Sequence, residues 1–416
     1  MREGSHVSAG DLVLLHSARQ LITLHGPQGP RRGPEMRNLA IIPDGAVLIR
    51  NGVIEDVGPT RRVANLVRAK RAREVDATGR IVLPAFVDPD ALLVTRSLSA
   101  GQKARVEKSA TAENSAPAIE PLRVMSKRRM EMRSEAMAHT LASYGVLTTG
   151  SSTSSADDPR NVSRILAVHK ALEGAPLRIR SVLAWPAGGL RPSADQETDL
   201  TEWLSTIRAR RLSSLVELSA GRDTLGLRTA AQLSMQSGFA VRFRSTGEIG
   251  QDTVELAVGC GAIALHWSPL SAHSLPAELS AADCIFVAAG SELVDYDSRD
   301  SGVVRSAVDS GLALALSSAF RTGATGTLNM QFILHLACAR LKLSPEEAIT
   351  AATHNAAAAL RFGDSAGSLA PGRRADLIVM DVADYRDLIT RAGHHDVLIV
   401  MRAGRIIYRR APLVLE

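Results

Sequence analysis

Residues Ile81 to Val94 read IVLPAFVDPDALLV and combine an apolar run with an acidic turn. The apolar beginning of this stretch predicts a buried strand, and the Asp-Pro-Asp step that follows predicts a turn. Asp90 and Leu92 lie two positions apart, a spacing that directs both side chains to the same face of an extended chain. The end of this strand is therefore the first place to look for a site.

Downstream of this stretch, short apolar strands alternate with amphipathic helical patterns. The predicted strands begin at Ile81, Gly145, Arg178, Ser214, Phe239, Gly261, Cys284 and Leu312. One helix begins with a capping box formed by Ser344 and Glu347, with Pro345 at its first position. About eight strand–helix units predict a (β/α)₈ TIM barrel over residues 83–365. A doubly wound open sheet is the competing architecture, but no glycine-rich phosphate loop follows the first strand.

Both ends of the chain show a different pattern, in which short β-branched runs alternate with turn signals. The Asn51-Gly52 step separates two alternating runs and predicts a type I′ hairpin. Ala403-Gly404 is a similar turn near the other end. We therefore expect residues 1–82 and 366–416 to form one composite β-sandwich. The predicted fold class is α/β, a TIM barrel with a small β-sandwich formed by the N- and C-terminal segments.

Composition limits the class of protein. A chain of 416 residues with 45% hydrophobic content can bury a large core, and it contains no apolar run of the roughly 18 residues that a membrane span requires. Three widely spaced cysteines are expected to be free thiols in a reducing cytoplasm. The net charge of +6 is compatible with an anionic partner, but arginine-rich solvated faces are the better explanation. With only 3% aromatic residues, the chain lacks a stacking platform for nucleic acid. We expect a cytoplasmic protein that binds neither nucleic acid nor membrane.

A long basic segment, Arg96 to Arg133, connects the first predicted barrel strand to the second. Sites in this architecture are built from the loops at the carboxyl ends of the strands, called the barrel mouth below. A mobile lid and an ordinary solvated insertion both fit this composition, and the sequence leaves the two open.

Several stretches carry a family resemblance. They are ARQLITLHGPQGPRRGPEMRNLAIIPDGAVLIRNGVIEDVGP, GRIVLPAFVDP, THNAAAAL, DSAGSLAPGRRADLIVMDVADYRDL and VLIVMRAGRIIY. In these stretches the chain resembles the amidohydrolase superfamily, and its imidazolonepropionase family in particular. The terminal stretches match specifically, whereas the barrel matches mainly in layout. The resemblance implies a barrel enclosed by a sandwich of both termini, a zinc or iron cofactor, and hydrolysis of C–N bonds in cyclic amides.

The metal ligands that the resemblance implies are changed in this chain. In that family the first strand ends in His-x-His, whose imidazoles reach one divalent ion. Here these places are Asp90 and Leu92, and Leu92 has no lone pair. The family's histidine on strand five is replaced by Arg244, which has donors only. We predict that the guanidinium of Arg244 faces the carboxylate of Asp90 and replaces the bound cation.

The other family positions are also substituted, with one exception. Trp185 stands where a histidine follows strand three, and Glu217 stands where a carboxylated lysine would lie on strand four. His266 on strand six is the ligand position that is retained. On strand eight the family's aspartate contacts the metal and takes the proton of its bound water, and here the matching stretch has Ser318. An unactivated serine is no base near neutral pH.

These substitutions favour a degenerate barrel without zinc, iron or another cofactor: a pseudoenzyme, a small-ligand binder or a regulatory subunit. No catalytic residue is assigned. The candidate ligand-binding residues at the mouth are Asp90, Leu92, Trp185, Glu217, Arg244, His266, Trp267, Ser317 and Ser318. The expected partners are a small acidic or amide-like ligand and, as a homo-oligomer or a paired subunit, a second copy or an active relative.

Two catalytic alternatives remain open. One is a hydrolase of cyclic amides with an atypical metal site, in which Asp90, His266 and Glu217 are the ligands. The other is metal-free chemistry with Ser317 or Ser318 as nucleophile and His266 as its base. The serine-rich stretch from Gly150 to Ser155 would lie at the same mouth, although turn chemistry explains it as well.

Overall fold

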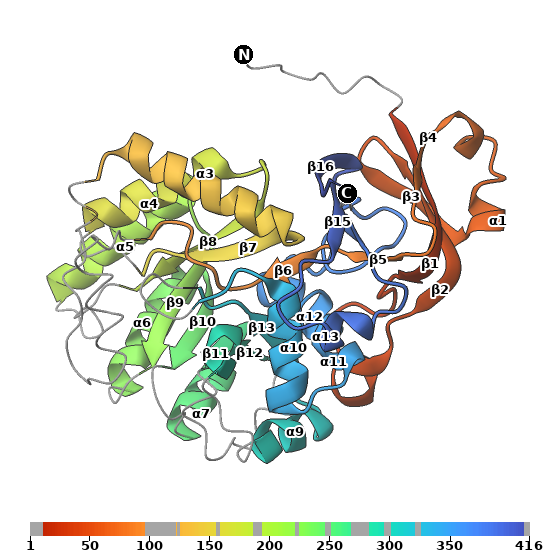
Figure 1. Cartoon of the computed structure of the whole chain (residues 1–416). Coiled ribbons are helices and arrows are strands. Elements are labelled where there is room, and N and C mark those ends of the chain that lie inside the picture. Colours follow the sequence, from red (N-terminus) through yellow and green to blue (C-terminus); the bar gives the residue numbers. More distant parts are fainter. Residues whose placement is uncertain are drawn as a thin grey trace, which may run out of the picture.

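Two eight-stranded sheets form the frame of the molecule (Figure 1). The computed structural model describes residues 11–95, 122, 125–154, 159–185, 194–220, 224–245, 251–267, 283–294, 301–320 and 326–411. One sheet is the wall of a barrel surrounded by helices, and the other combines strands from both ends of the chain. The predicted α/β class with a TIM barrel is confirmed.

The barrel strands are parallel and follow one another in chain order. They are β6 (Phe86–Asp88), β7 (Val146–Ser152), β8 (Arg178–Ala184), β9 (Leu215–Ala220), β10 (Ala240–Ser245), β11 (Ala264–Trp267), β12 (Ile285–Ala289) and β13 (Leu314–Ser317). A parallel bridge between Ala91 and Phe320 links the first strand's end to the last strand's end. All carboxyl ends therefore meet at one mouth.

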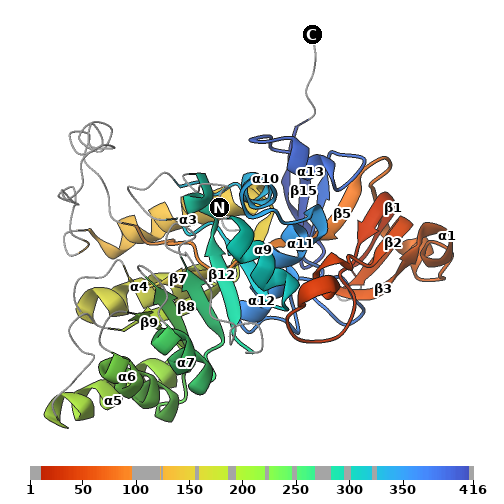
Figure 2. The same ribbon diagram turned by 90° about the horizontal axis from the view of Figure 1, so that it is seen from below.

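Helices cover the outside of this barrel (Figure 2). They are α3 (Lys127–Ser143), α4 (Pro159–Leu172), α5 (Ala194–Ala209), α6 (Thr224–Gln236), α7 (Gln251–Gly259), α9 (Ser301–Asp309), α10 (Met330–Leu341) and α11 (Pro345–Ala351). The large core between strands and helices contains Leu147, Leu166, Phe243 and Leu265. The predicted capping box of Ser344 and Glu347 is present at the start of α11. No helix among the described residues is both long and apolar enough to cross a membrane.

A short helix fills the end of the barrel opposite the mouth. This helix, α12 (His354–Ala359), and the Leu360 that follows it contribute Ala356 and Leu360 to a small apolar cluster with strand residues such as Val87 and Ile285. Apolar side chains therefore occupy this part of the barrel interior.

The second sheet contains both termini of the described chain. Its strands are β1 (Leu12–Ile22), β2 (Ile41–Arg50), β3 (Val53–Pro59), β4 (Arg73–Asp76), β5 (Ile81–Pro84), β14 (Leu377–Met380), β15 (Val397–Arg402) and β16 (Arg405–Arg409), flanked by α1 (Thr60–Val63) and α13 (Asp387–Thr390). The type I′ turn at Asn51-Gly52 is confirmed, with φ of +52° and +80°. Strand β14 pairs with β5, so C-terminal and N-terminal segments share one ladder.

Two predictions about segment boundaries were wrong. The strand predicted from Ile81 to Asp88 is two strands, because Pro84 has no N–H to continue a ladder, and the chain passes from the terminal sheet to the barrel at Ala85. The basic segment is not a loop as far as Arg133, because α3 begins at Lys127 with the Ser126 hydroxyl accepting from the Arg129 N–H. Residues 96–121 of this segment lie outside the described residues.

Candidate functional site

The barrel mouth holds a cluster of charged side chains from neighbouring strands. Arg242 of β10 is in register with Glu217 of β9, and Arg244 with His266 of β11. Residues in register on adjacent parallel strands point to the same face, so these four side chains converge. Asp90 joins them from the chain that leaves β6.

Strand β7 supports the segment that carries Asp90. The Ala91 N–H donates to the Gly150 carbonyl at 2.9 Å, and the Leu93 N–H donates to the Ser151 hydroxyl at 3.0 Å. A Cβ on Gly150 would lie 2.3 Å from the Pro89 carbonyl oxygen, so only glycine permits this approach. The predicted serine-rich loop thus begins as part of a strand and fixes the position of Asp90.

The predicted ion pair between Arg244 and Asp90 is confirmed. Arg244 Nη2 lies 2.8 Å from Asp90 Oδ2 and 2.8 Å from Glu217 Oε2. Arg242, which sequence reasoning missed, lies deeper: its Nη2 is 2.6 Å from Glu217 Oε2 and 3.5 Å from Asp90 Oδ1. Its Nη1 also donates to the Pro89 carbonyl at 3.0 Å. Asp90, Glu217, Arg242 and Arg244 are called the mouth network below.

The mouth network is electrically balanced, because two guanidiniums face two carboxylates. Burial opposes ionisation of Glu217, yet Arg242 and Arg244 outweigh it and hold the pKa of this carboxyl below its usual value. Burial also opposes the charge of Arg244, but Asp90 and Glu217 raise its pKa. The Ser152 hydroxyl donates to Glu217 Oε1 at 3.0 Å. Each charge therefore stabilises its neighbours, and none is left for a bound ion.

Asp88, at the end of β6, is a second buried acid that sequence reasoning missed. Its Oδ1 accepts from the backbone N–H groups of Asp90 at 3.1 Å and Ser318 at 3.0 Å, while Oδ2 has no hydrogen-bond partner among the described residues. Complete burial raises the pKa of Asp88 to about 6. The sequence shows an acidic residue at this position, but its raised pKa results from burial, which the sequence alone does not reveal.

His266 is neutral at the mouth. Burial, followed by the charge of Arg242, lowers its pKa to about 3. Its Nδ1 is 3.8 Å from Asp90 Oδ2, and its Nε2 is buried without a hydrogen-bond partner in the described part of the chain. The retained histidine is thus beside the network rather than part of a ligand set.

The two serines of β13 and its end make structural hydrogen bonds. The Ser317 hydroxyl donates to the Ala288 carbonyl at 3.2 Å. The Ser318 hydroxyl accepts from the Phe320 N–H at 3.2 Å and lies 3.5 Å from the Asp90 carbonyl. Within the described ranges no hydrogen bond joins either hydroxyl to His266, so the serine–histidine arrangement is not assembled.

The predicted mouth position of Trp267 was wrong. It follows His266 directly on β11, and neighbouring side chains of a strand point to opposite faces. Trp267 is accordingly buried in the core outside the barrel, with its ring 4.8 Å from that of Phe286. Trp185 also packs against this core, and its backbone N–H donates to the backbone carbonyl of Glu217. Leu92 is buried, and its N–H donates to the Phe320 carbonyl.

Comparisons with known proteins place this chain in a family. An amidohydrolase-family model matches residues 278–407. The imidazolonepropionase of Solibacter usitatus is 32% identical over 421 aligned residues, which cover 96% of this chain and 99% of that protein. The chain belongs to the imidazolonepropionase-like amidohydrolases. The imidazolonepropionase of Chloroflexus aggregans is 29% identical, covering 95% of this chain and 98% of its own.

Solved structures support the fold of this imidazolonepropionase-like amidohydrolase. A zinc-bound adenosine deaminase from Xanthomonas campestris superposes with a TM-score of 0.65 at 18% identity, covering 95% of this chain and 92% of that one. The ochratoxinase of A. niger gives 0.68 at 14% identity, with 97% of each chain covered. These likenesses show the barrel architecture, and at such identities they show no activity.

The mouth residues of this amidohydrolase do not fit the metal that its family implies. Arg244 stands where the resemblance implies a histidine ligand, and it lies 2.8 Å from the Asp90 carboxylate, which would have to bind the ion. A divalent cation there would be repelled by two guanidiniums, and Leu92 offers it no electron pair. In the described part of the chain, no group of three or more His, Cys, Asp or Glu side chains is placed to hold a metal.

Proposed function

We propose that this imidazolonepropionase-like chain is a pseudoenzyme, in which the mouth network stands in place of the catalytic metal. The observation that carries the proposal is the contact of Arg244 with both Asp90 and Glu217 at 2.8 Å. A permanently charged guanidinium at the ligand position supplies the positive charge that organises the mouth, but it cannot bind and acidify water as a metal does.

The mouth also lacks a competent base. Glu217 has a lowered pKa because Arg242 and Arg244 outweigh its burial, and a weakly basic, hydrogen-bonded carboxylate is a poor proton acceptor. Ser318 stands where the family has its aspartate, and its hydroxyl is committed to the backbone of Phe320. Loss of both the metal ligands and the base supports the absence of metal-dependent hydrolysis.

Binding is then the remaining role that we propose for the mouth. Arg244 is the member of the mouth network that reaches solvent, with 20% of its side chain exposed against none for Arg242. A small acidic or amide-like ligand entering the mouth would meet this guanidinium first, because charged donors bind carboxylate and amide oxygens strongly. His266 Nε2, buried without a partner among the described residues, would offer a second contact.

The test is metal content together with activity. Tag-free protein from cells supplied with zinc, iron and manganese would be analysed by plasma mass spectrometry and assayed for hydrolysis of imidazolonepropionate. We expect far less than one equivalent of metal and no hydrolysis. One equivalent of a single metal with measurable turnover would overturn the proposal.

A matched variant shows that the assay can detect a restored site. The substitutions Asp90→His, Leu92→His, Arg244→His and Ser318→Asp together rebuild the implied ligand set. They remove one carboxylate and one guanidinium from the mouth network, so Arg242 and Glu217 stay paired at 2.6 Å. We expect this variant to gain metal, because its imidazoles and new carboxylate are good ligands for zinc.

A further inference from the structure

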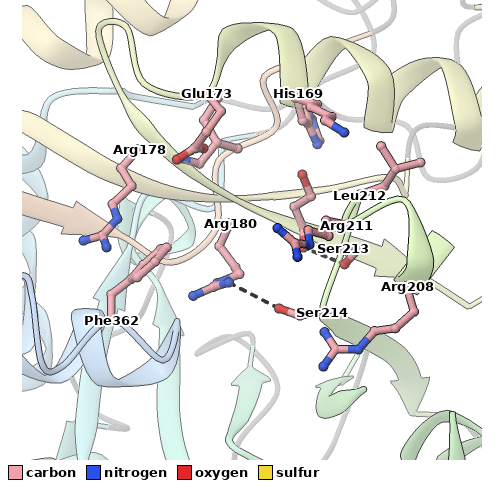
Figure 3. A pocket seen from close by; sticks show the side chains of 13 residues that line it. His169, Glu173, Arg178, Arg180, Arg208, Arg211, Leu212, Ser213, Ser214 and Phe362 are labelled. Atoms are coloured by element: carbon pink, nitrogen blue, oxygen red, sulfur yellow. Dashed lines mark hydrogen bonds between the residues drawn. The ribbon is translucent and has the colours of Figure 1, made fainter. Parts of the chain in front are cut away.

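A polar cavity lies at the end of the barrel opposite the mouth, at the amino-terminal ends of β8 and β9. It has a volume of about 390 Å³ and is called the basal cavity below. Its lining comes from the end of α4, the start of β8, the segment between α5 and β9, and Phe362 (Figure 3). None of these residues belongs to the mouth network, so this cavity is a separate feature.

The lining of the basal cavity is strongly basic. Five of its side chains are cations, and one is a carboxylate: Lys170, Arg178, Arg180, Arg208 and Arg211 against Glu173. The Glu173 carboxylate accepts from the Ile179 N–H at 2.7 Å. Among the described residues, none of the five cations lies within 4 Å of a carboxylate oxygen. The cavity therefore has an uncompensated positive charge.

Neutral groups hold two of these cations in fixed positions. Arg178 and Arg180 are two residues apart on β8 and point the same way, and the guanidinium carbon of each lies 4.0 Å from the centre of the Phe362 ring. Arg180 donates to the Leu360 carbonyl at 3.1 Å and to the Ser214 hydroxyl at 3.2 Å. Both arginines are thus held in place without a direct ion pair, although Glu173 acts on both from a distance. Such preorganised guanidiniums favour binding of an anion.

His169 is a second, independent observation that points to a ligand. It lies on α4 and lines the same cavity, and Figure 3 shows its ring directed from the helix toward the arginines. The side chain is 1% exposed, yet neither ring nitrogen has a hydrogen-bond partner among the described residues. Burial keeps the ring neutral by lowering its pKa to about 4. A buried imidazole normally finds a partner, so an unpaired one suggests that a ligand supplies it.

We propose that the basal cavity binds a small polyanion that carries phosphate groups. Arg178, Arg180, Arg208 and Arg211, which all line the cavity, would contact the phosphate oxygens, and His169 would donate its N–H to one of them. Guanidiniums match the geometry of phosphate, and the volume suits a small molecule rather than a polymer. The Phe362 ring is covered by the two arginines, so no free aromatic face remains to stack a base. This site is independent of whether the mouth hydrolyses anything.

The test uses inorganic pyrophosphate as the probe, with the full chain in phosphate-free buffer of low ionic strength. Binding would be measured by titration calorimetry on the wild type and on the double variant Arg208→Ala with Arg211→Ala, whose changed residues are both exposed. We expect pyrophosphate to bind the wild type and the affinity of the variant to fall about tenfold or more, since two charged contacts are lost. Failure of millimolar pyrophosphate to bind the wild type would overturn the proposal.

A charge-matched control separates this site from a general effect of net charge. The double variant Arg61→Ala with Arg71→Ala removes two exposed cations beside the terminal sheet, and we expect it to bind pyrophosphate as the wild type does. Equal weakening in both variants would contradict a built site. His169→Gln, which keeps a donor, should retain more affinity than His169→Phe. Tighter binding of a short single-stranded oligonucleotide than of pyrophosphate would overturn the choice of a small ligand.

Discussion

The two ends of this barrel both gather arginines, but they treat the charges in opposite ways. At the mouth, Arg242 and Arg244 contact Asp90 and Glu217 at 2.6–3.5 Å, and the sum of charges is zero. In the basal cavity, Arg178 and Arg180 both contact the Phe362 ring. Arg180 also donates to a backbone carbonyl and to a serine hydroxyl. At the mouth, ion pairs compensate the charges and the partly exposed Arg244 is the member of the network that can also meet a ligand, whereas the basal cavity has an excess of positive charge.

Burial explains why the two ends differ. The side chain of Arg242 has no exposed area. Burying an unpaired charge raises the free energy of the folded state by roughly several kcal/mol, so Arg242 requires carboxylate partners. Arg208 and Arg211 are exposed, so water solvates them and no carboxylate is required. An excess of charge can persist only where solvent or a ligand compensates it.

We expect the largest effect when an arginine is replaced by methionine at the mouth and, for comparison, in the basal cavity. Arg242→Met leaves Asp90 and Glu217 with a single guanidinium, and we expect it to lower the free energy of unfolding by about 3–5 kcal/mol, as for other broken buried pairs. Arg208→Met, at the basal cavity, should change it by about 0.5 kcal/mol or less. Urea denaturation measures both values.

A double variant checks that pairing causes the effect. Adding Glu217→Gln to Arg242→Met removes one carboxylate and restores the balance between Asp90 and Arg244, so we expect partial recovery of stability. If the two substitutions were simply additive, or if Arg208→Met cost as much as Arg242→Met, the distinction between the two ends would fail.

The second test asks whether the mouth stays balanced at all pH values. Asp88 has a pKa of about 6 when folded, against an ordinary value near 3.8, so folding favours its protonated form. Its stabilising contribution is complete below about pH 4 and is lost as the pH rises to about 6, a change of roughly 2–3 kcal/mol. Above that pH the mouth gains a negative charge.

Asp88→Asn should remove this dependence. The variant keeps an oxygen for the N–H groups of Asp90 and Ser318, and we expect its stability relative to the wild type to increase between pH 4 and pH 7.5. His266 does not obscure the comparison, because its folded pKa of about 3 lies below this window and its unfolded form is common to both proteins. Parallel stability profiles in urea would show that Asp88 ionises normally.

Local patterns account for what the sequence predicted correctly. The Asn51-Gly52 turn and the Ser344 capping box depend on residues a few positions apart, and both are present. The contact of Arg244 with Asp90 was predictable because both lie at carboxyl ends of barrel strands, which share one mouth.

Two features of the mouth were missed although strand alternation could have shown them, whereas the basal cavity could not be predicted from local sequence. Arg242 alternates with Arg244 in the run AVRFRS, and that spacing was a usable signal for a second inward arginine. Trp267 was assigned to the mouth although it neighbours His266 on a strand and must face the other way. The basal cavity combines four segments with no motif in common, so only the assembled chain brings His169 to the arginines.

The smallest test concerns salt. The basal cations repel one another across water, and dissolved ions screen such exposed charges while affecting the buried mouth network much less. We expect the Arg208→Ala, Arg211→Ala variant to be about 0.5 kcal/mol more stable than the wild type near 50 mM NaCl, with the difference disappearing near 500 mM. The Arg61→Ala, Arg71→Ala control should show no such change. A gain that persists at high salt would mean that Arg208 and Arg211 act through packing, and the basal cavity would then have no excess charge to offer a phosphate.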